Sequence, residues 1–281
     1  MRRLAPAKVN LHLKVLRRRE DGYHDLATLM HRVSLCDELI FEKTSRGVSL
    51  RCPGSGLPED EGNLVFRAAK KILDLLDPPF GLHITLVKKI PTAAGLGGGS
   101  SDAATTLLAV NEMTGNRLPQ DRLMKMGAQL GADVPFFIGR GTAWAFGIGD
   151  RLEPLSDLPK LSFLLVNPRF ELPTPLVYKG LNLALTNVPI HYSIPRFSTV
   201  QDVAAGLHND LEAVSIRLHP VIGEIKDVLL HHGALGALMS GSGPTVFGLF
   251  ADEEAAIEAE RSLGGRYPWD VFRVSSYTEG R

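Results

Sequence analysis

The stretch Pro91-Thr92-Ala93-Ala94-Gly95-Leu96-Gly97-Gly98-Gly99-Ser100-Ser101-Asp102 decides how this chain is organised. An apolar run at residues 82–90 leads into it, and small and apolar residues at 103–110 follow it. This order predicts a strand, a glycine-rich loop (residues 91–101) and a helix whose N-terminus is capped by serine. Glycine lets the backbone approach a ligand closely, and the first turn of a helix has N–H donors without partners. Such a loop is suited to binding phosphate, although a glycine turn without a ligand would have a similar composition.

The glycine-rich loop matches neither of two common phosphate-binding motifs. A Walker loop has lysine and then serine or threonine after its last glycine, whereas Ser100 and Ser101 follow Gly99 here. A dinucleotide fingerprint, Gly-x-Gly-x-x-Gly, fits from Gly95 onward until its last position, which is Ser100. Because the loop contains no lysine, positive charge for a phosphate must come from elsewhere in the chain or from a metal ion.

Length and composition place the chain among ordinary globular proteins. It has 281 residues, of which 44% are hydrophobic and 22% charged, enough for one large domain or two modest ones. The formal net charge is zero, so no basic field indicates nucleic acid as a partner. No apolar run approaches the ~20 residues that span a bilayer, and residues 1–6 lack the apolar core of a signal peptide. The two cysteines, Cys36 and Cys52, form no metal motif or disulfide framework, so we expect a cytoplasmic protein without a membrane partner.

The N-terminal segment alternates between apolar and polar residues. Residues 9, 11, 13 and 15 are apolar, and Lys8, Asn10, His12 and Lys14 lie between them. This period predicts a half-buried strand in which Lys8 and Asn10 share one face. Two interpretations remain open, since that face could reach a ligand or could be a charged, exposed strand edge.

Two further places in the chain combine chemistry with local structure. Tyr23 and His24 follow the turn signal Asp21-Gly22, where an aromatic ring and an imidazole could stack on a planar ring or could form a packed loop corner. Asp133 is surrounded by apolar or small residues over 131–137. A carboxylate in such surroundings is hydrogen-bonded, paired with a cation or bound to a metal, because isolated burial is costly. A helix-capping role for Asp133 is the alternative.

The remaining pattern indicates an α+β fold with two lobes. Helical spacing predicts a helix over 64–76, after Asn63 and before Pro78. In the second half, the prolines at 173 and 175 fix a bend around Thr174, and a second glycine cluster occupies residues 239–244. Strands and helices mix without strict βαβ alternation. A weak boundary near residue 155 divides the chain into residues 1–155 and 156–281.

Three segments together resemble the motifs of the GHMP kinases, a family of small-metabolite kinases. The glycine-rich loop is similar to the family's phosphate loop, residues 5–11 to its N-terminal motif and residues 236–243 to its third motif. The resemblance implies an N-terminal lobe like ribosomal protein S5 domain 2, a ferredoxin-like C-terminal lobe and a site in the cleft between them. It also implies ATP as the phosphate donor, Mg²⁺ as the metal ion and a small alcohol as the acceptor.

The residues at 21–24, 131–135 and 173–175 are similar to one branch of the family, whose members phosphorylate a hydroxyl of a cytidine diphosphate sugar alcohol for isoprenoid synthesis. This likeness implies that Asp133 is the catalytic base and Lys8 the lysine beside it, which keeps it ionised. It also places a set of side chains at the substrate: Asn10 at the acceptor, Tyr23 and His24 at the cytosine, and Thr174 and Tyr178 on the far wall. The family often has phenylalanine where this chain has Tyr178, and tyrosine keeps the stacking face.

The same resemblance assigns the nucleotide side of the site. The residues that it places at ATP are Pro91, Ala93, Ala94, Gly95, Leu96, Gly97, Gly98, Gly99, Ser100, Ser101 and, near the adenosine, Asn63. The ligands of Mg²⁺ stay unassigned. Two other functions are compatible with the motifs. One is a GHMP kinase for homoserine or mevalonate, which would need no pocket for a base. The other is a non-catalytic sensor, against which the presence of both Lys8 and Asp133 argues.

Overall fold

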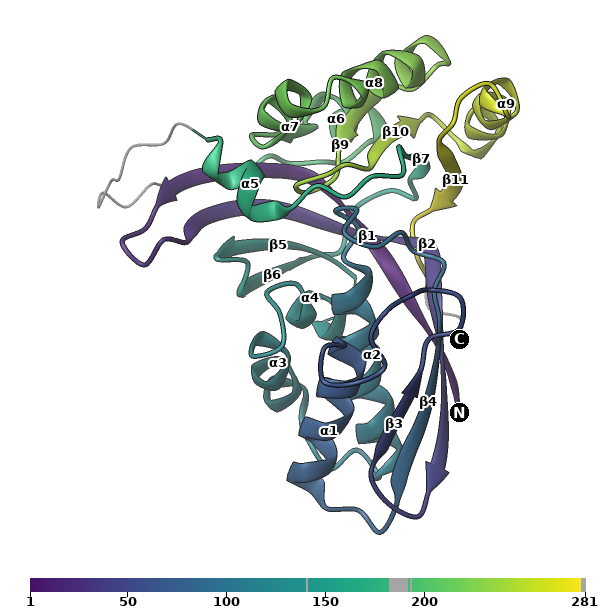
Figure 1. The fold of residues 1–281 in the computed structure, drawn as a ribbon. Coiled ribbons are helices and arrows are strands. Elements are labelled where there is room, and N and C mark those ends of the chain that lie inside the picture. The colour runs from purple at the N-terminus through teal and green to yellow at the C-terminus, as the bar shows by residue number, and fades with distance from the viewer. Residues whose placement is uncertain (140, 182–191, 193, 279–281) are drawn as a thin grey trace. The chain divides into compact units, whose positions relative to one another are not determined.

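The structure, a computed structural model, describes residues 1–139, 141–181, 192 and 194–278 (Figure 1). The chain divides into two compact units, each made of separate segments. Unit 1 contains Met1–Ala7, Leu35–Pro91 and Gly97–Arg140, and unit 2 contains Lys8–Ser34, Thr92–Leu96 and Gly141–Arg281. The division of the chain at residue 155 stays a prediction.

The strands of unit 1 come from three parts of the chain. β2 (His24–Thr44) pairs antiparallel with β4 (Gly81–Val87), from Glu38 opposite Val87 to Thr44 opposite Gly81. β4 in turn pairs in parallel with β3 (Val48–Arg51). β1 (Arg2–Arg18) is longer than the strand predicted from the N-terminal alternation, and β1 and β2 each contribute residues to both units.

Four helices complete unit 1, namely α1 (Leu64–Leu76), α2 (Gly98–Met113), α3 (Gln120–Ala128) and α4 (Val134–Gly139) (Figure 1). α1 packs against α2, and α2 packs against α3 and α4. The predicted helix over 64–76 is confirmed. Its first turn is capped by the Asn63 side chain, which accepts the N–H of Val65 at 2.9 Å, and it ends at Asp77 in the left-handed region.

The start of α2 differs from the prediction. The expected serine cap is wrong, because the helix already begins at Gly98 and its N-cap is Gly97, with a φ of 69° and no side-chain hydrogen bond. Glycine tolerates this left-handed conformation, so the chain can turn into the helix before it reaches Ser100. The N–H donors of the first turn are therefore not used by a capping side chain.

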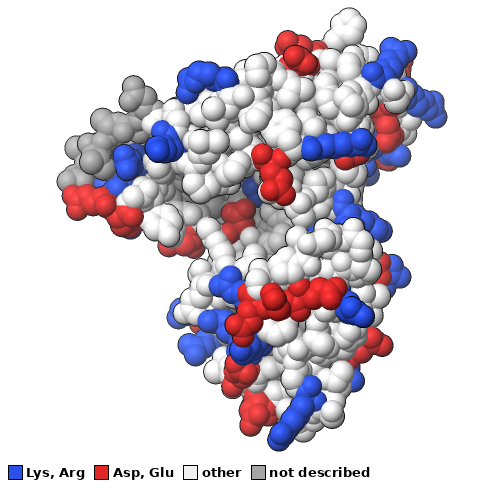
Figure 2. Space-filling model, in the orientation of Figure 1, with Lys and Arg blue, Asp and Glu red and all other residues white. Residues whose placement is uncertain are grey.

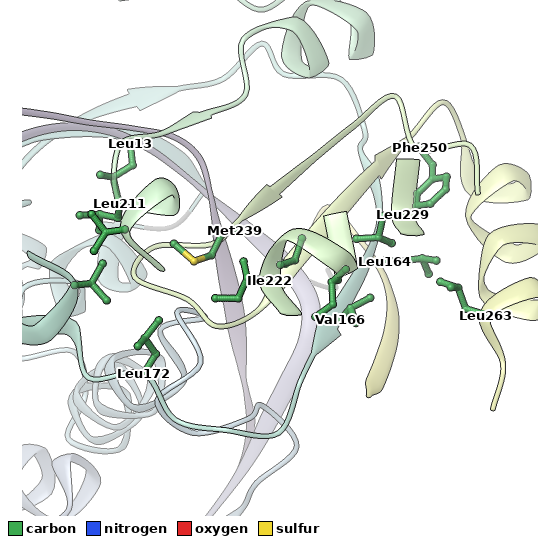
Figure 3. Close-up of a cluster of buried hydrophobic side chains, with 14 of the residues drawn as sticks. Leu13, Leu164, Val166, Leu172, Leu211, Ile222, Leu229, Met239, Phe250 and Leu263 are labelled. Carbon is green, nitrogen blue, oxygen red and sulfur yellow. The ribbon is translucent and has the colours of Figure 1, made fainter. Parts of the chain in front are cut away.

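Unit 2 contains a four-stranded antiparallel sheet, in the order β11-β7-β10-β9. Its strands are β7 (Ser162–Asn167), β9 (Gly236–Met239), β10 (Val246–Phe250) and β11 (Asp270–Ser275). α8 (Val221–His231) packs against β9 and β10, and α9 (Glu253–Leu263) packs against β7, β10 and β11. Figure 3 shows apolar side chains of β1, β7, β9, β10, α8 and α9 gathered in one core.

Unit 2 also contains strands outside this sheet and several short helices. The first half of β2 pairs with β5 (Thr142–Gly147), which pairs with β6 (Arg151–Leu155), and β1 pairs in parallel with β8 (His208–Asn209). The described part of unit 2 also contains the short helices α5 (Thr174–Lys179), α6 (Val200–Ala205) and α7 (Glu212–Leu218). The bend predicted around Thr174 is the first turn of α5, because prolines at 173 and 175 have a φ that suits a helix start.

The surface agrees with the balanced composition. Lysine and arginine side chains are interspersed with aspartate and glutamate on the face in Figure 2. Among the described residues, no helix is both long enough and apolar enough to cross a membrane.

The buried His31 in unit 2 should make the free energy of unfolding depend on pH. The His31 ring hydrogen-bonds Thr142 Oγ1 at 2.7 Å and Ser276 Oγ at 2.9 Å. Burial, assisted by the charge of Arg32, lowers the pKa of His31 to about 4. The unfolded chain binds this proton near pH 6.5. The stability that neutral His31 provides is therefore present above pH 6.5 and is lost as the pH falls toward 4.

We expect the free energy of unfolding to fall by roughly 3 kcal/mol more between pH 7 and pH 4 in the wild type than in His31→Asn. Urea titrations at several pH values measure this difference. Equal pH dependence in the two proteins would show that the pKa of His31 in the folded protein is close to its value in the unfolded chain.

Candidate active site

The first half of the glycine-rich loop is fixed in unit 2 by the second glycine cluster. The Ser240 hydroxyl donates to the carbonyl oxygen of Gly95 at 2.9 Å and accepts the N–H of Asn10 at 3.2 Å. The N–H of Thr245 donates to the carbonyl oxygen of Ala94 at 3.4 Å. Gly95 has a φ of +76°, and a Cβ at this position would lie 2.0 Å from the carbonyl oxygen of Ser240. Only glycine permits this approach of two backbones.

Lys8 and Asn10 lie beside this half of the loop and are almost fully buried, with exposed fractions of 5% and 3%. The N–H of Lys8 donates to the carbonyl oxygen of Leu96 at 2.9 Å. The Lys8 ammonium donates to Asn10 Oδ1 at 2.5 Å, and Asn10 Nδ2 donates to Thr28 Oγ1 at 2.8 Å. The interpretation of this face as an exposed strand edge is therefore wrong.

Gly241 brings the second glycine cluster close to Lys8 and Asn10, and Asn209 holds the cluster in place. A Cβ on Gly241 would lie 3.1 Å from Asn10 Oδ1 and 3.4 Å from Lys8 Nζ. Asn209 Nδ2 donates to the carbonyl oxygens of Met239 and Gly241, at 2.7 and 2.8 Å. No signal in the sequence marks Asn209 or Ser240 as functional. Neither belongs to a spacing motif of its own, and only the glycines around Ser240 drew attention to it.

Two of the residues predicted to hold a base, His24 and Tyr178, are in contact within unit 2. The rings of His24 and Tyr178 are 5.0 Å apart between centroids and inclined by 33°. Tyr23 is 61% exposed, so it does not form a packed loop corner. Thr174 Oγ1 hydrogen-bonds Ser242 Oγ at 2.7 Å, which ties the start of α5 to the second glycine cluster. Burial, together with the charge of Arg18, lowers the pKa of His24, so its ring is neutral at pH 7.

The second half of the glycine-rich loop forms the first turns of α2 in unit 1. Residues Gly98, Gly99 and Ser100 make up the first turn, without a capping side chain. Ser101 Oγ is buried and has no hydrogen-bond partner among the described residues. Asn63, expected near the adenosine, uses its amide within the protein, because Oδ1 caps α1 and Nδ2 donates to the carbonyl oxygen of Pro58 at 2.9 Å. It fixes the turn before α1, and its predicted contact with ATP is untested.

Asp133 belongs to unit 1, as does the start of α2. It is half-buried and directly precedes α4. A Cβ on Gly131 would lie 3.6 Å from Ser100 Oγ, so Gly131, two residues before Asp133, is close to the first turn of α2. This position is compatible with a carboxylate at a phosphate site and also with a residue that caps α4. Lys8 belongs to unit 2 and Asp133 to unit 1.

Comparisons with known proteins identify the family. The model for the GHMP kinases N terminal domain matches residues 63–141, and the model for GHMP kinases C terminal matches residues 194–268. The 4-diphosphocytidyl-2-C-methyl-D-erythritol kinase of Syntrophus aciditrophicus is 62% identical over 97% of this chain and 98% of that protein. The enzyme of the same name from Geobacter sulfurreducens is 52% identical over 93% of this chain and 94% of that protein.

Solved structures agree with these relatives. A crystal structure of 4-(cytidine 5'-diphospho)-2C-methyl-D-erythritol kinase has a TM-score of 0.82 at 38% identity, covering 99% of this chain and 100% of that one. The homoserine kinase of Cytophaga hutchinsonii has a TM-score of 0.73 at 19% identity, covering 99% of this chain and 94% of that one, and shows a shared fold. The two-lobed α+β fold predicted from the three motifs is confirmed, and this chain belongs to the GHMP kinase family.

Proposed function

We propose that this chain is an ATP-dependent kinase that phosphorylates the 2-hydroxyl of 4-diphosphocytidyl-2-C-methyl-D-erythritol. Relatives named for this substrate match more than nine-tenths of the chain at 50–62% identity. The observation that carries the choice of substrate is the contact of His24 with Tyr178, with the largely exposed Tyr23 directly before His24 in the chain. A kinase for a small alcohol without a base has no need of three such rings.

The chemistry of these rings suits cytosine. Tyr23 and Tyr178 present aromatic faces on which a base stacks, and stacking accepts any planar ring. His24 supplies the specificity, because a neutral imidazole has one nitrogen that donates and one that accepts a hydrogen bond. The edge of cytosine offers an amino donor beside acceptors. The lowered pKa of His24 keeps the imidazole in the form that can make both bonds.

Replacing Tyr23 tests this assignment. We expect Tyr23→Ala to raise the KM for the cytidine substrate roughly 5- to 150-fold, because stacking contributes ~1–3 kcal/mol per base. The KM for ATP should stay the same, and Tyr23→Phe should keep the wild-type KM because it keeps the ring. Steady-state kinetics with each substrate varied in turn measure both constants. An unchanged KM for the cytidine substrate in Tyr23→Ala would favour a kinase for a smaller alcohol.

For the nucleotide, we propose that the glycine-rich loop holds the ATP phosphates. The first turn of α2 has N–H donors that no capping side chain uses, and a helix N-terminus has a partial positive charge. The packing of Gly95 against Ser240 fixes the backbone just before that turn. Lys8 is tied to the same loop through Leu96, and its ammonium provides the cation that the loop lacks.

The proposed reaction moves one phosphoryl group. The oxygen of the 2-hydroxyl forms a bond to the γ-phosphorus, and the bond from the γ-phosphorus to the oxygen shared with the β-phosphate breaks to release ADP. The Asp133 carboxylate accepts the proton of the hydroxyl. Lys8 stabilises the negative charge on the transferring group. Asn10, bonded to Lys8 and Thr28, orients the ammonium for this task.

Mg²⁺ accompanies ATP in this proposal. The described residues contain no group of three or more His, Cys, Asp or Glu side chains that could hold a metal ion. Mg²⁺ is usually held by substrate phosphates, water and one or two carboxylates, so it does not need such a group. We therefore propose that it enters as the complex with ATP, where it neutralises phosphate charge, and we assign no step to it.

A turnover assay with ATP and a panel of alcohols tests the proposed function as a whole. The panel contains 4-diphosphocytidyl-2-C-methyl-D-erythritol, homoserine and mevalonate, and ADP formation is measured at saturating ATP. Turnover confined to the cytidine substrate is the expected result. Turnover of homoserine or mevalonate instead would assign the chain to another GHMP kinase activity, and binding of ligands without any turnover would indicate a sensor.

A further inference from the structure

A group of buried charges lies under the first turn of α2, within unit 1. It consists of two carboxylates, Asp37 from β2 and Asp102 from α2, and the ammonium of Lys88, which follows β4. The side chains of Asp37, Asp102 and Lys88 are 0%, 2% and 10% exposed. Burial of charges is costly unless they are paired and hydrogen-bonded. None of the three has a part in the phosphoryl transfer proposed above.

Lys88 joins the two carboxylates and also contacts the start of the helix. Its ammonium donates to Asp102 Oδ2 at 2.9 Å and to Asp37 Oδ2. It lies 3.2 Å from the position that a Cβ on Gly98 would occupy. Glycine at residue 98 therefore leaves room for the ammonium directly against the backbone of the first turn of α2.

The two carboxylates differ in how completely the protein satisfies them. Asp37 Oδ1 accepts the N–H groups of Lys89 and Ile90, at 2.5 and 2.9 Å, and Asp37 Oδ2 accepts from Lys88. Asp102 accepts only from Lys88, and its Oδ1 is buried without a hydrogen-bond partner among the described residues. A buried, unpartnered oxygen penalises the ionised form of a carboxyl group more than the neutral form. Asp102 is therefore the carboxylate whose surroundings favour a proton.

The surrounding groups favour the same distribution. Burial raises the pKa of Asp102 to about 7, against the opposing charge of Lys88, and the charge of Asp37 and a hydrogen bond to it add to the effect. Although burial opposes it, the charges of Asp102 and Asp37 raise the pKa of Lys88, which stays protonated. Burial also raises the pKa of the nearby Cys52 thiol, which is neutral at pH 7. Glu59 accepts the N–H of Cys52 at 2.7 Å.

We propose that Asp37, Lys88 and Asp102 support the glycine-rich loop and that Asp102 takes up a proton when nucleotide phosphates bind at the first turn of α2. This inference rests on the proposed use of that turn for ATP. With both carboxylates ionised, the group has one net negative charge, which stabilises the empty helix N-terminus and repels a phosphate. A proton taken from solvent and shared with Asp37 makes the group neutral. Lys88 and Asp102 are thus positioning residues.

Calorimetry of nucleotide binding tests this proton. ADP is titrated into the full chain at pH 6 and pH 8, each in two buffers with different ionisation enthalpies. We expect uptake of close to one proton per ADP at pH 8 and much less at pH 6. The affinity for ADP should be about tenfold weaker at pH 8.5 than at pH 6, because an ionised Asp102 must first be neutralised.

Two variants separate Asp102 from other sources of protons. Asp102→Asn cannot ionise, so its proton uptake at pH 8 should disappear and its affinity should vary only as the phosphates of ADP titrate. Asp74→Asn removes an exposed carboxylate of α1 and should keep the uptake of the wild type. The wild-type titration is decisive even where a variant fails to fold.

Each outcome bears on a different claim. ADP binding by the wild type without proton uptake at pH 8 would overturn the role of Asp102 and leave the proposed function intact. Equal uptake in Asp102→Asn would also overturn it, because the proton would then bind elsewhere. No binding of ADP at any pH would remove both this inference and the nucleotide site on which it rests.

Discussion

Asp133→Asn is expected to lower kcat by ~10²–10⁴-fold while ATP still binds, because a general base contributes about that factor and the amide cannot accept the proton. The amide has nearly the shape of the carboxylate, so Gly131 and the turn before α4 should keep their position near Ser100. Steady-state kinetics give kcat, and calorimetry with ADP gives the affinity for nucleotide. The two measurements together distinguish lost chemistry from a damaged loop.

The control for this variant is Asp121→Asn, which removes an exposed carboxylate from the first turn of α3 in the same unit. Its kcat should equal that of the wild type. A kcat for Asp133→Asn close to that of the control would exclude Asp133 as the base and leave it the capping role before α4. Loss of ADP binding together with kcat would instead indicate that Asp133 holds the loop in place.

Gly95→Ala is expected to have the second large effect, on stability and nucleotide binding together. The new Cβ would lie 2.0 Å from the carbonyl oxygen of Ser240, and the residue has a φ of +76°. To remove this clash, the backbone of the glycine-rich loop or of the second glycine cluster has to move. Overpacking and an unfavourable φ cost ~1–3 kcal/mol each, so the free energy of unfolding should fall by roughly 3 kcal/mol or more. Affinity for ADP should fall at least roughly tenfold with it.

Gly223→Ala is the matched control in the same unit. Gly223 lies inside α8, and a Cβ there would lie 3.6 Å from Ile216 Cγ2, an ordinary contact. Alanine should leave nucleotide binding unchanged and raise the free energy of unfolding by up to about 1 kcal/mol, as in any helix interior. Urea titrations and calorimetry measure both variants. Wild-type values for Gly95→Ala would mean that the loop can adopt another conformation without cost.

Local signals in the sequence predicted a helix or strand well where its start, its apolar pattern and its end are all determined by neighbouring residues. Asn63 before an apolar helical pattern and Pro78 after it gave the bounds of α1, because capping and chain termination act over a few residues. The same reasoning failed at the start of α2. A serine next to a helix suggests a cap. Here Gly97 adopts a left-handed conformation and starts the helix earlier, and the capping preference of serine gives no sign of this.

The strands show where local pattern is insufficient. Alternation predicted a strand near residues 9–15, and the observed β1 runs over Arg2–Arg18. Strand ends depend on hydrogen bonds to partners elsewhere in the chain, such as those between Met1 and Phe41 at the start of β1, so polarity near an end does not stop the strand.

The sequence by itself determined the family, through three motifs in order, and named Lys8, Asp133 and the ring residues as candidates. Alternation placed Lys8 and Asn10 on one face, but it could not tell whether that face is covered, because burial depends on residues more than two hundred positions away. The tertiary structure decided this by packing Ser240 and Gly241 against them. It also brings Asp37, Lys88 and Asp102 together beneath the glycine-rich loop, although no spacing in the sequence connects them. Charges that are far apart in the sequence interact strongly only after the fold has brought them together and removed water.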